Sequence, residues 1–177
     1  TLKLVRILDS RSQFTSIAFN ADGSRLAGAG YAAVAQVWNV ADGQTLLTIP
    51  NAGVMVALSP DGMKLAAVNE FSDVAADGTL LPVKTVVQVY QVDSGKLLLS
   101  LNSLTTISEW NMESVETIGL PFSADGTLIH AVNNFGDVHA WELTSGRLIG
   151  TLVNQATRSR LSGGFCKASG SVGGSSF

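Results

Sequence analysis

A turn pattern that returns along the chain constrains its fold more than any other feature. Residues 19–23, 58–62 and 122–126 each run from an apolar residue to an Asp-Gly pair, and each is followed by another apolar run. Such a pair predicts a tight hairpin turn, because glycine adopts a positive φ without steric cost. The first two of these glycines, Gly23 and Gly62, lie 39 residues apart. The chain is therefore expected to consist of repeated structural units.

Two further patterns follow each Asp-Gly turn. The first pattern is an apolar residue followed by an aromatic one, as in Val37-Trp38, Val89-Tyr90 and Ala140-Trp141. The second is another glycine turn, which follows at residues 41–43, 93–95 and 144–146. The first glycine and the aromatic residue are 15 residues apart in the first and third units, and 28 in the second. The middle unit therefore carries an insertion of 13 residues.

Each unit predicts four short antiparallel strands, because β-forming residues dominate and no segment shows a helical period. The predicted strands are 14–20, 24–30, 34–40 and 44–50; then 54–59, 64–69, 85–92 and 96–101; then 115–123, 127–132, 137–143 and 147–153. Residues 2–8 are similar to the last strand of a preceding unit. The spacing is close to the roughly 40–45 residues of a four-stranded propeller blade. We expect an all-β fold with about three complete β-propeller blades plus a leading strand. A β-sandwich is the alternative, but it does not require matching turns at matching offsets.

The units resemble the Trp-Asp (WD) repeat family and the neighbouring YVTN-type propellers. The resemblance covers residues 14 to 154 and consists of an apolar run, a turn such as Ser-Pro-Asp-Gly at 59–62, a second apolar run with Trp, and Ser-Gly-Lys-Leu-Leu at 94–98. Asn39, Gln91 and Glu142 stand where the family often has Asp after Trp. The family's Gly-His pair is absent, and Ala32 and Phe135 stand in place of its turn Asp. These departures imply that the buried His-Ser-Asp-Trp network of typical members is missing.

The predicted organisation is a stretch of blades followed by a tail. Blades occupy residues 1–154, in units of about 11–50, 51–102 and 103–154, and a Gly/Ser-rich tail covers 155–177. Propellers use about 4–8 blades, so three do not close a ring. The chain is then part of a longer propeller, or a second copy completes the ring, or the tail supplies strands. We favour a fragment or an assembly of several chains.

Composition excludes several classes of function. The chain is 46% hydrophobic and 14% charged, with a net charge of −3 and no basic run, so we expect neither nucleic acid nor membrane as a partner. The single cysteine, Cys166, rules out an internal disulfide and favours a reducing compartment. We therefore expect a cytoplasmic protein, with export as the alternative.

No catalytic constellation stands out in the sequence. Both histidines, His130 and His139, fall inside predicted strands, and Cys166 has no partner motif. The aspartates that resemble paired carboxylates sit in tight turns, where Asp caps its own backbone; they are Asp22, Asp42, Asp61, Asp93 and Asp125. We expect no catalytic residues, no cofactor and no metal, and hence no enzyme.

Strand order predicts where a partner binds. The two glycine turns of every unit lie at one end of a four-stranded meander, whereas the long connections 70–84 and 102–114 both lie at the other end. Long loops on a rigid scaffold commonly carry binding residues, and Trp is favoured in binding hot spots. The candidate partner-binding residues are Phe71, Leu80, Leu81, Glu109, Trp110, Met112 and Glu113. The alternative is that Trp110 folds back and caps the blades.

The resemblance implies a non-catalytic protein-interaction scaffold, whose partner the sequence does not identify. Two alternatives rest on the same fold: a lid or gating domain of a larger hydrolase, and a small-ligand sensor that uses the central channel.

Overall fold

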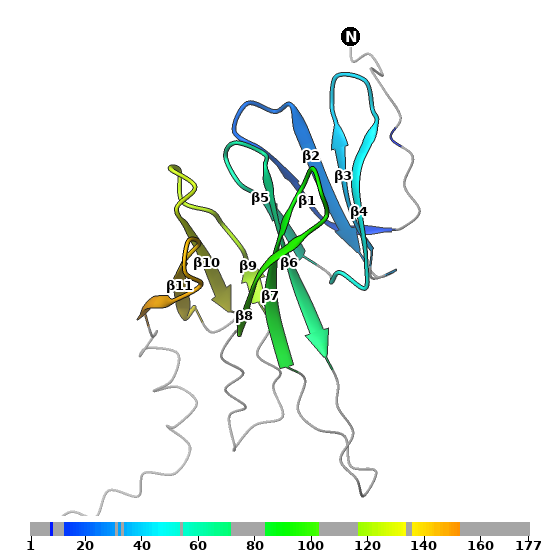
Figure 1. Ribbon diagram of the computed structural model, residues 1–177. Helices are drawn as coiled ribbons and strands as arrows, with labels where there is room; N and C mark the ends of the chain where they lie inside the picture. Colours follow the sequence, from blue (N-terminus) through cyan, green and yellow to red (C-terminus); the bar gives the residue numbers. More distant parts are fainter. Residues whose placement is uncertain are drawn as a thin grey trace, which may run out of the picture.

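Three four-stranded antiparallel sheets follow one another along the chain (Figure 1). The computed structural model describes residue 8 and residues 13–30, 32, 34–53, 55–71, 84–102, 117–133 and 136–152. Each sheet is a simple meander, in which every strand pairs with the next along the sequence. The whole described part of the chain is therefore built from local hairpins.

The sheets are called blade 1, blade 2 and blade 3. Blade 1 consists of β1 (Phe14–Phe19), β2 (Arg25–Gly30), β3 (Val34–Asn39) and β4 (Thr45–Pro50). Blade 2 consists of β5 (Met55–Leu58), β6 (Lys64–Phe71), β7 (Lys84–Gln91) and β8 (Leu97–Asn102). Blade 3 consists of β9 (Thr117–Gly119), β10 (Leu128–Asn133), β11 (Val138–Glu142) and β12 (Leu148–Leu152). Each sheet falls within one of the predicted units.

The predicted all-β class and the antiparallel blades are confirmed, and most strand ends agree with the sequence prediction to within two residues. The first strand of blade 3 was wrongly predicted as continuous from 115 to 123. Strand β9 ends at Gly119, and the pairing resumes only as an isolated bridge between Phe122 and Ile129. Pro121 lies in this gap, and it has no N–H to donate to a ladder. The expected leading strand 2–8, except Leu8, and the tail 155–177 lie outside the described residues.

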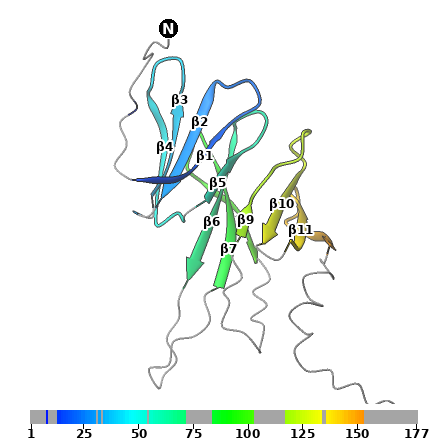
Figure 2. The ribbon, with the colours of Figure 1, turned by 180° about the vertical axis from the view of Figure 1, so that it is seen from behind.

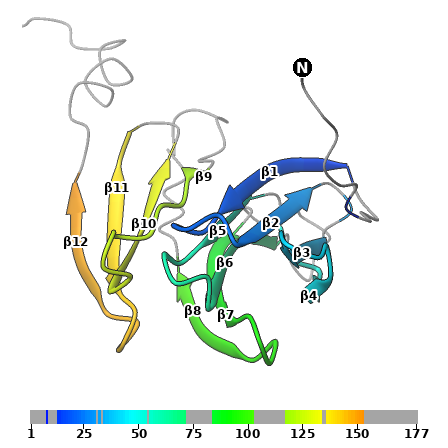
Figure 3. The same ribbon diagram turned by 90° about the horizontal axis from the view of Figure 1, so that it is seen from above.

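Two apolar cores lie between the blades. One core joins blade 1 to blade 2 and the other joins blade 2 to blade 3, so the middle blade is packed on both faces (Figure 3). This sandwiching explains why the middle strands are apolar at consecutive positions rather than at every second one. In β6, Leu65 and Ala67 face blade 1, whereas Ala66 and Val68 face blade 3.

The strand pairing makes positions in the three blades equivalent. Trp38 pairs with Leu26, Tyr90 with Leu65, and Trp141 with Ile129. Tyr90 and Trp141 belong to the cores shared with the preceding blade. We call this side of a blade its upstream face and the opposite side its downstream face.

Candidate functional site

The turns between the first and second strands and between the third and fourth strands of each blade gather at one end of the molecule, which we call the turn end (Figures 1 and 2). Gly23, Gly62 and Gly126 have φ values of 72°, 71° and 69°, the left-handed conformation that the sequence predicted for them. In each turn the aspartate accepts a hydrogen bond from the backbone N–H two residues later, at 2.9 to 3.0 Å. The predicted capping role of these aspartates is thus confirmed.

The same hydrogen bonds set the acidity of the turn aspartates. The Ser123 hydroxyl donates to Asp125 Oδ1 at 2.5 Å, and with the Thr127 N–H and hydroxyl it lowers the pKa of Asp125 to about 2. The Ser59 hydroxyl lowers the pKa of Asp61 in the same way. These carboxylates are therefore ionised and engaged locally, which leaves them poorly suited to proton transfer near neutral pH.

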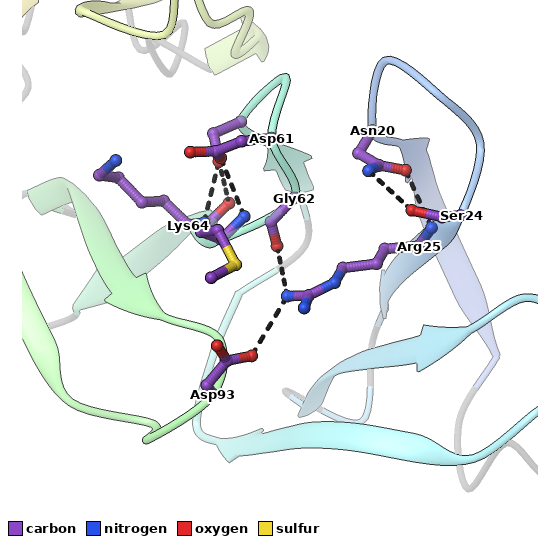
Figure 4. A network of polar contacts seen from close by, with 9 residues as sticks. Asn20, Ser24, Arg25, Asp61, Gly62, Lys64 and Asp93 are labelled. Atoms are coloured by element: carbon purple, nitrogen blue, oxygen red, sulfur yellow. Dashed lines mark hydrogen bonds and ion pairs between the residues drawn. The ribbon is translucent and has the colours of Figure 1, made fainter.

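A polar link joins blades 1 and 2 at the turn end (Figure 4). Arg25 Nη1 donates to the Gly62 carbonyl at 2.9 Å and lies 3.3 Å from Asp93 Oδ1. The Ala21 N–H also donates to the Pro60 carbonyl across this seam, at 3.1 Å. Sequence reasoning assigned Asp93 only to its own turn and missed this link, because 68 residues separate Asp93 from Arg25.

The two histidines lie in strands, as predicted, but on opposite faces of blade 3. His130 pairs with Ala140 and His139 with Ala131, so their side chains point to different sides of the sheet. His139 is buried, and its Nδ1 lies 3.1 Å from Thr151 Oγ1. Burial lowers the pKa of His139, and the charge of Asp137 partly opposes this effect. The two imidazoles cannot share one metal ion or one substrate atom.

A partly buried polar row runs along the upstream face of blade 2, from Tyr90 near the turns to Asn69 near the opposite end. The side-chain amide of Asn69 donates to Gln88 Oε1, and the Tyr90 hydroxyl donates to the same oxygen at 2.6 Å. Asn69 Oδ1 in turn accepts from the Gly53 N–H at 2.6 Å. The row satisfies polar groups that would otherwise be costly to bury. The sequence offers a weak signal for it, since Asn69 and Gln88 interrupt apolar runs.

The same row is incomplete in blade 1. Gln36 and Trp38 occupy the positions of Gln88 and Tyr90, and Gly30 stands at the position of Asn69. Gln36 Oε1 and Trp38 Nε1 are buried and have no hydrogen-bond partner among the described residues. For Trp38 this agrees with the expected loss of the family's buried network.

The end opposite the turns, which we call the loop end, carries the two long connections. Strands β6 and β7 are each eight residues long, whereas β2 and β3 each have six. Their ladder continues through the pairs Glu70↔Thr85 and Phe71↔Lys84, beyond the equivalent of the last pair of blade 1, Gly30↔Val34. The β6–β7 hairpin therefore reaches further at this end than the β2–β3 hairpin does (Figure 1).

Of the predicted partner-binding residues, one lies among the described residues. Phe71 is the last residue of β6, at the loop end where the sequence placed it. The other candidates, which are Leu80, Leu81, Glu109, Trp110, Met112 and Glu113, lie outside the described residues.

Within 13–152, less the gaps given above, no group of three or more His, Cys, Asp or Glu side chains is placed to hold a metal ion. No helix in the same residues is long and apolar enough to cross a membrane.

Solved structures resemble this fold at low sequence identity. A structure of U3-55K superimposes with a TM-score of 0.60 and 19% identity, covering 84% of this chain and 42% of that one. The WD40 repeats of RRP9 give 0.58 and 18%, covering 84% and 41%. The hydrazine synthase of Kuenenia stuttgartiensis gives 0.59 and 15%, covering 86% and 40%. This chain thus spans less than half the length of each of these chains.

No family model and no curated protein sequence matches the chain. At such low identity the structural likeness bears on the fold alone. The matches with U3-55K and with RRP9 each cover 84% of this chain, and the second of these structures consists of WD40 repeats. The described residues form consecutive blades of a WD40-like β-propeller.

Proposed function

We propose that the chain is part of a non-catalytic protein-interaction scaffold of the WD-repeat type, and that partners bind at the loop end. The observation that carries this proposal is the extended β6–β7 ladder, which adds two residue pairs beyond the equivalent hairpin of blade 1. At about 3.3 Å per residue, the hairpin projects roughly 7 Å further. A projecting hairpin on a packed base is a good support for a contact surface.

The turn end is a weaker candidate for the binding surface. Its aspartates are engaged with their own turns, and Arg25 is engaged with Gly62 and Asp93. A partner at that end would have to compete with these hydrogen bonds. The loop end carries no such set of repeated, self-satisfied turns in the sequence.

We assign the partner contact to Phe71, Leu80, Leu81, Glu109, Trp110, Met112 and Glu113. A tryptophan and a methionine flanked by two carboxylates combine a large apolar area with an adaptable side chain and a polar rim. The partner that fits this set is a protein. We also propose that it is neither nucleic acid nor membrane, and that the protein acts in the cytoplasm.

The lack of enzymatic activity is part of the same proposal. It is supported by the separation of His130 and His139 onto opposite faces of blade 3 and by the capping role of the turn aspartates. We expect neither a cofactor nor a metal ion to be required for binding.

The test compares two single variants of the full chain. Trp110→Ala removes the proposed anchor, and Met63→Ala removes a half-exposed apolar residue at the turn end as a control. Proteins captured from a cell lysate and the melting temperature are measured for wild type and both variants. Loss of captured proteins for Trp110→Ala alone, at an unchanged melting temperature, supports the proposal.

Two other outcomes would count against the proposed contact. A large fall in melting temperature for Trp110→Ala indicates that this residue caps the blades. Equal capture by wild type and by Trp110→Ala removes Trp110 from the contact surface.

A further inference from the structure

Exposed aliphatic side chains lie where the outer strands of blades 2 and 3 begin. They are Leu97 and Leu98 of β8, which are 44% and 38% exposed, and Leu148 and Ile149 of β12, which are 42% and 44% exposed. The strand pairing makes the two sets equivalent, because the first residue of each lies opposite the aromatic residue of its blade. The same apolar pair is thus presented at the same place on two consecutive blades.

An uncovered blade face does not account for this exposure. Blade 2 is packed on both faces, yet Leu97 and Leu98 remain exposed. Further along the same strand, Leu99 and Leu101 turn towards blade 3, where each has a methyl carbon 3.1 or 3.5 Å from an ideal Cβ placed on Gly146. Large apolar side chains that stay exposed together on a packed scaffold mark a surface for another molecule.

Blade 1 has a different pair of residues at these positions. Thr45 stands at the position of Leu97. Leu46 stands at the position of Leu98, but it packs against the core between blades 1 and 2. The blade architecture therefore does not require exposed aliphatic side chains here, and they are a property of blades 2 and 3.

A cation precedes each of the two apolar pairs. Lys96 and Arg147 are both exposed, and their carbonyls accept equivalent hydrogen bonds, from the Gln91 N–H at 2.8 Å and from the Glu142 N–H at 3.0 Å. Blade 1 has the neutral Gln44 at this position. Charge and apolar area thus occur together in blades 2 and 3, and both are missing from blade 1.

The two cations are available to a partner. Neither the Lys96 nor the Arg147 side chain takes part in an ion pair or a hydrogen bond among the described residues. The carboxylates of the same two turns are engaged elsewhere, since Asp93 pairs with a cation of blade 1 and Glu142 accepts from a serine hydroxyl. In a chain with a net charge of −3, this local excess of positive charge favours a partner that brings carboxylates.

Side chains, and not the strand edges, are the groups that such a partner meets. Strands β8 and β12 are the outer strands of their sheets, and each pairs with one described strand (Figure 3). Leu98 and Ile149 are each the extra residue of a bulge in that pairing. A bulge at a sheet edge opposes the regular addition of a further strand.

We propose that these residues form a second partner-binding surface, which takes a protein segment that combines acidic with large apolar side chains. We call it the rim patch; it consists of Lys96, Leu97, Leu98, Arg147, Leu148 and Ile149. The rim patch goes beyond the proposed function, because it lies on the outer strands next to the turns and includes none of the loop-end residues.

An anionic membrane shares part of this chemistry but fits the rim patch less well. Basic segments that bind such membranes carry clusters of about 4–8 Lys or Arg residues, and the patch has Lys96 and Arg147. Its aliphatic side chains are more than half buried, which limits how far they can insert into a bilayer. The negative net charge of the chain also opposes binding to an anionic surface.

The test selects binders from a phage-displayed library of random peptides on the immobilised full chain. We expect the enriched peptides to contain more Asp and Glu, together with more large apolar residues, than the starting library. Enriched peptides are then synthesised with a fluorescent label, and their affinity for the wild-type chain and its variants is measured by fluorescence anisotropy. Circular dichroism checks that each variant is folded.

Two double variants of the rim patch should weaken peptide binding. Leu98→Ser with Ile149→Ser should do so about tenfold or more, because apolar area that a peptide would cover is removed. Lys96→Glu with Arg147→Glu should weaken binding strongly at low salt and less at high salt, because exposed charges are screened. The charge variant serves as the test if the aliphatic variant does not fold.

Three single variants are the controls and should bind the peptides like the wild type. Gln44→Glu adds a carboxylate at the equivalent position of blade 1, and Met63→Ser changes an apolar residue that is 36% exposed in the first turn of blade 2. Trp110→Ala alters the proposed loop-end contact, so the failure of one surface can be told from the failure of the other.

Each contrary result overturns the rim patch in a different way. A selection that enriches no acidic and apolar peptides shows that no such segment is recognised. Peptides that bind both double variants as well as the wild type contact another surface, and peptides lost only with Trp110→Ala bind at the loop end. Binding to vesicles that contain phosphatidylserine, abolished by the charge variant, would assign the patch to a membrane.

Discussion

His139 and its equivalents show how one position is adapted from blade to blade. Gln36, Gln88 and His139 stand two residues before the aromatic residue of each blade, on the upstream face. Gln88 is satisfied by two donors of its own blade, and His139 is placed beside Thr151. A titratable group at this position makes blade 3 differ chemically from the other two.

Stability should depend on pH through His139. Burial lowers the pKa of His139 in the folded state, so the unfolded chain binds the proton more readily. The contribution of neutral His139 is complete above the unfolded pKa of about 6.5 and is lost as pH falls towards the lower folded pKa. Urea unfolding at pH 8 and pH 5 should therefore show a smaller free energy of unfolding at pH 5.

The matched variant is His139→Gln, which installs the residue of blades 1 and 2. It should reduce this pH dependence. An unaltered pH dependence in His139→Gln would assign it to other groups.

The Tyr90 hydroxyl gives a second prediction. Tyr90→Phe removes a donor to Gln88 Oε1 and keeps the ring in the core. The free energy of unfolding should fall by about 0.5–1.5 kcal/mol, the usual net value of a hydrogen bond. Denaturant unfolding measures it, and no change at all would mean that the Asn69 amide alone satisfies Gln88.

Each blade is held to the next by side chains at its turns as well as by its core. Arg25 is the described residue that links a turn of blade 1 to both turns of blade 2. Lys64 stands in blade 2 at the position of Arg25, but blade 3 has Thr144 at the position of Asp93, so the second seam lacks this carboxylate. An exposed pair of this kind stabilises weakly.

A double-mutant cycle tests the size of the Arg25 link. Arg25→Ala should lower the free energy of unfolding by about 1 kcal/mol, since it also removes the donor to the Gly62 carbonyl. Its coupling to Asp93→Ala should stay below about 1 kcal/mol and decrease at high salt. A coupling of several kcal/mol, insensitive to salt, would mean that the pair is more deeply desolvated than its exposure indicates.

The molecule as a whole is a row of blades in which contacts run between neighbours. The core between blades 1 and 2 and the core between blades 2 and 3 have different members. Blade 2 takes part in both, so it should be the most protected part of the chain. Stability in such a row is approximately a sum over units and seams.

Truncating one leucine or isoleucine should separate the two seams. Leu65→Ala acts in the first core and Ile129→Ala in the second, and each should cost about 2–5 kcal/mol. Hydrogen exchange should show the loss of protection centred on blades 1 and 2 for the first variant, and on blades 2 and 3 for the second. A uniform loss in both variants would indicate that the row opens as one unit.

The strands and turns could be read from the sequence because the signals for them are local. A positive φ at Gly23 or Gly62 and alternating apolar residues act within a few positions, so their 39-residue spacing was enough to identify blades. The break in β9 was missed, although Pro121 was visible, because a proline stops a ladder only where its N–H would have been needed.

The meeting of distant side chains followed from register and packing, which no short stretch of sequence encodes. The Arg25–Asp93 link spans 68 residues, and it exists because two turns are brought to one end by the stacking of blades. Ile17 and Val56 occupy equivalent strand positions, but their exposure differs. Val56 is covered by blade 1, whereas Ile17 faces no neighbouring blade among the described residues. Burial is a property of the assembled surfaces, and so it cannot be assigned to a residue before its neighbours in space are known.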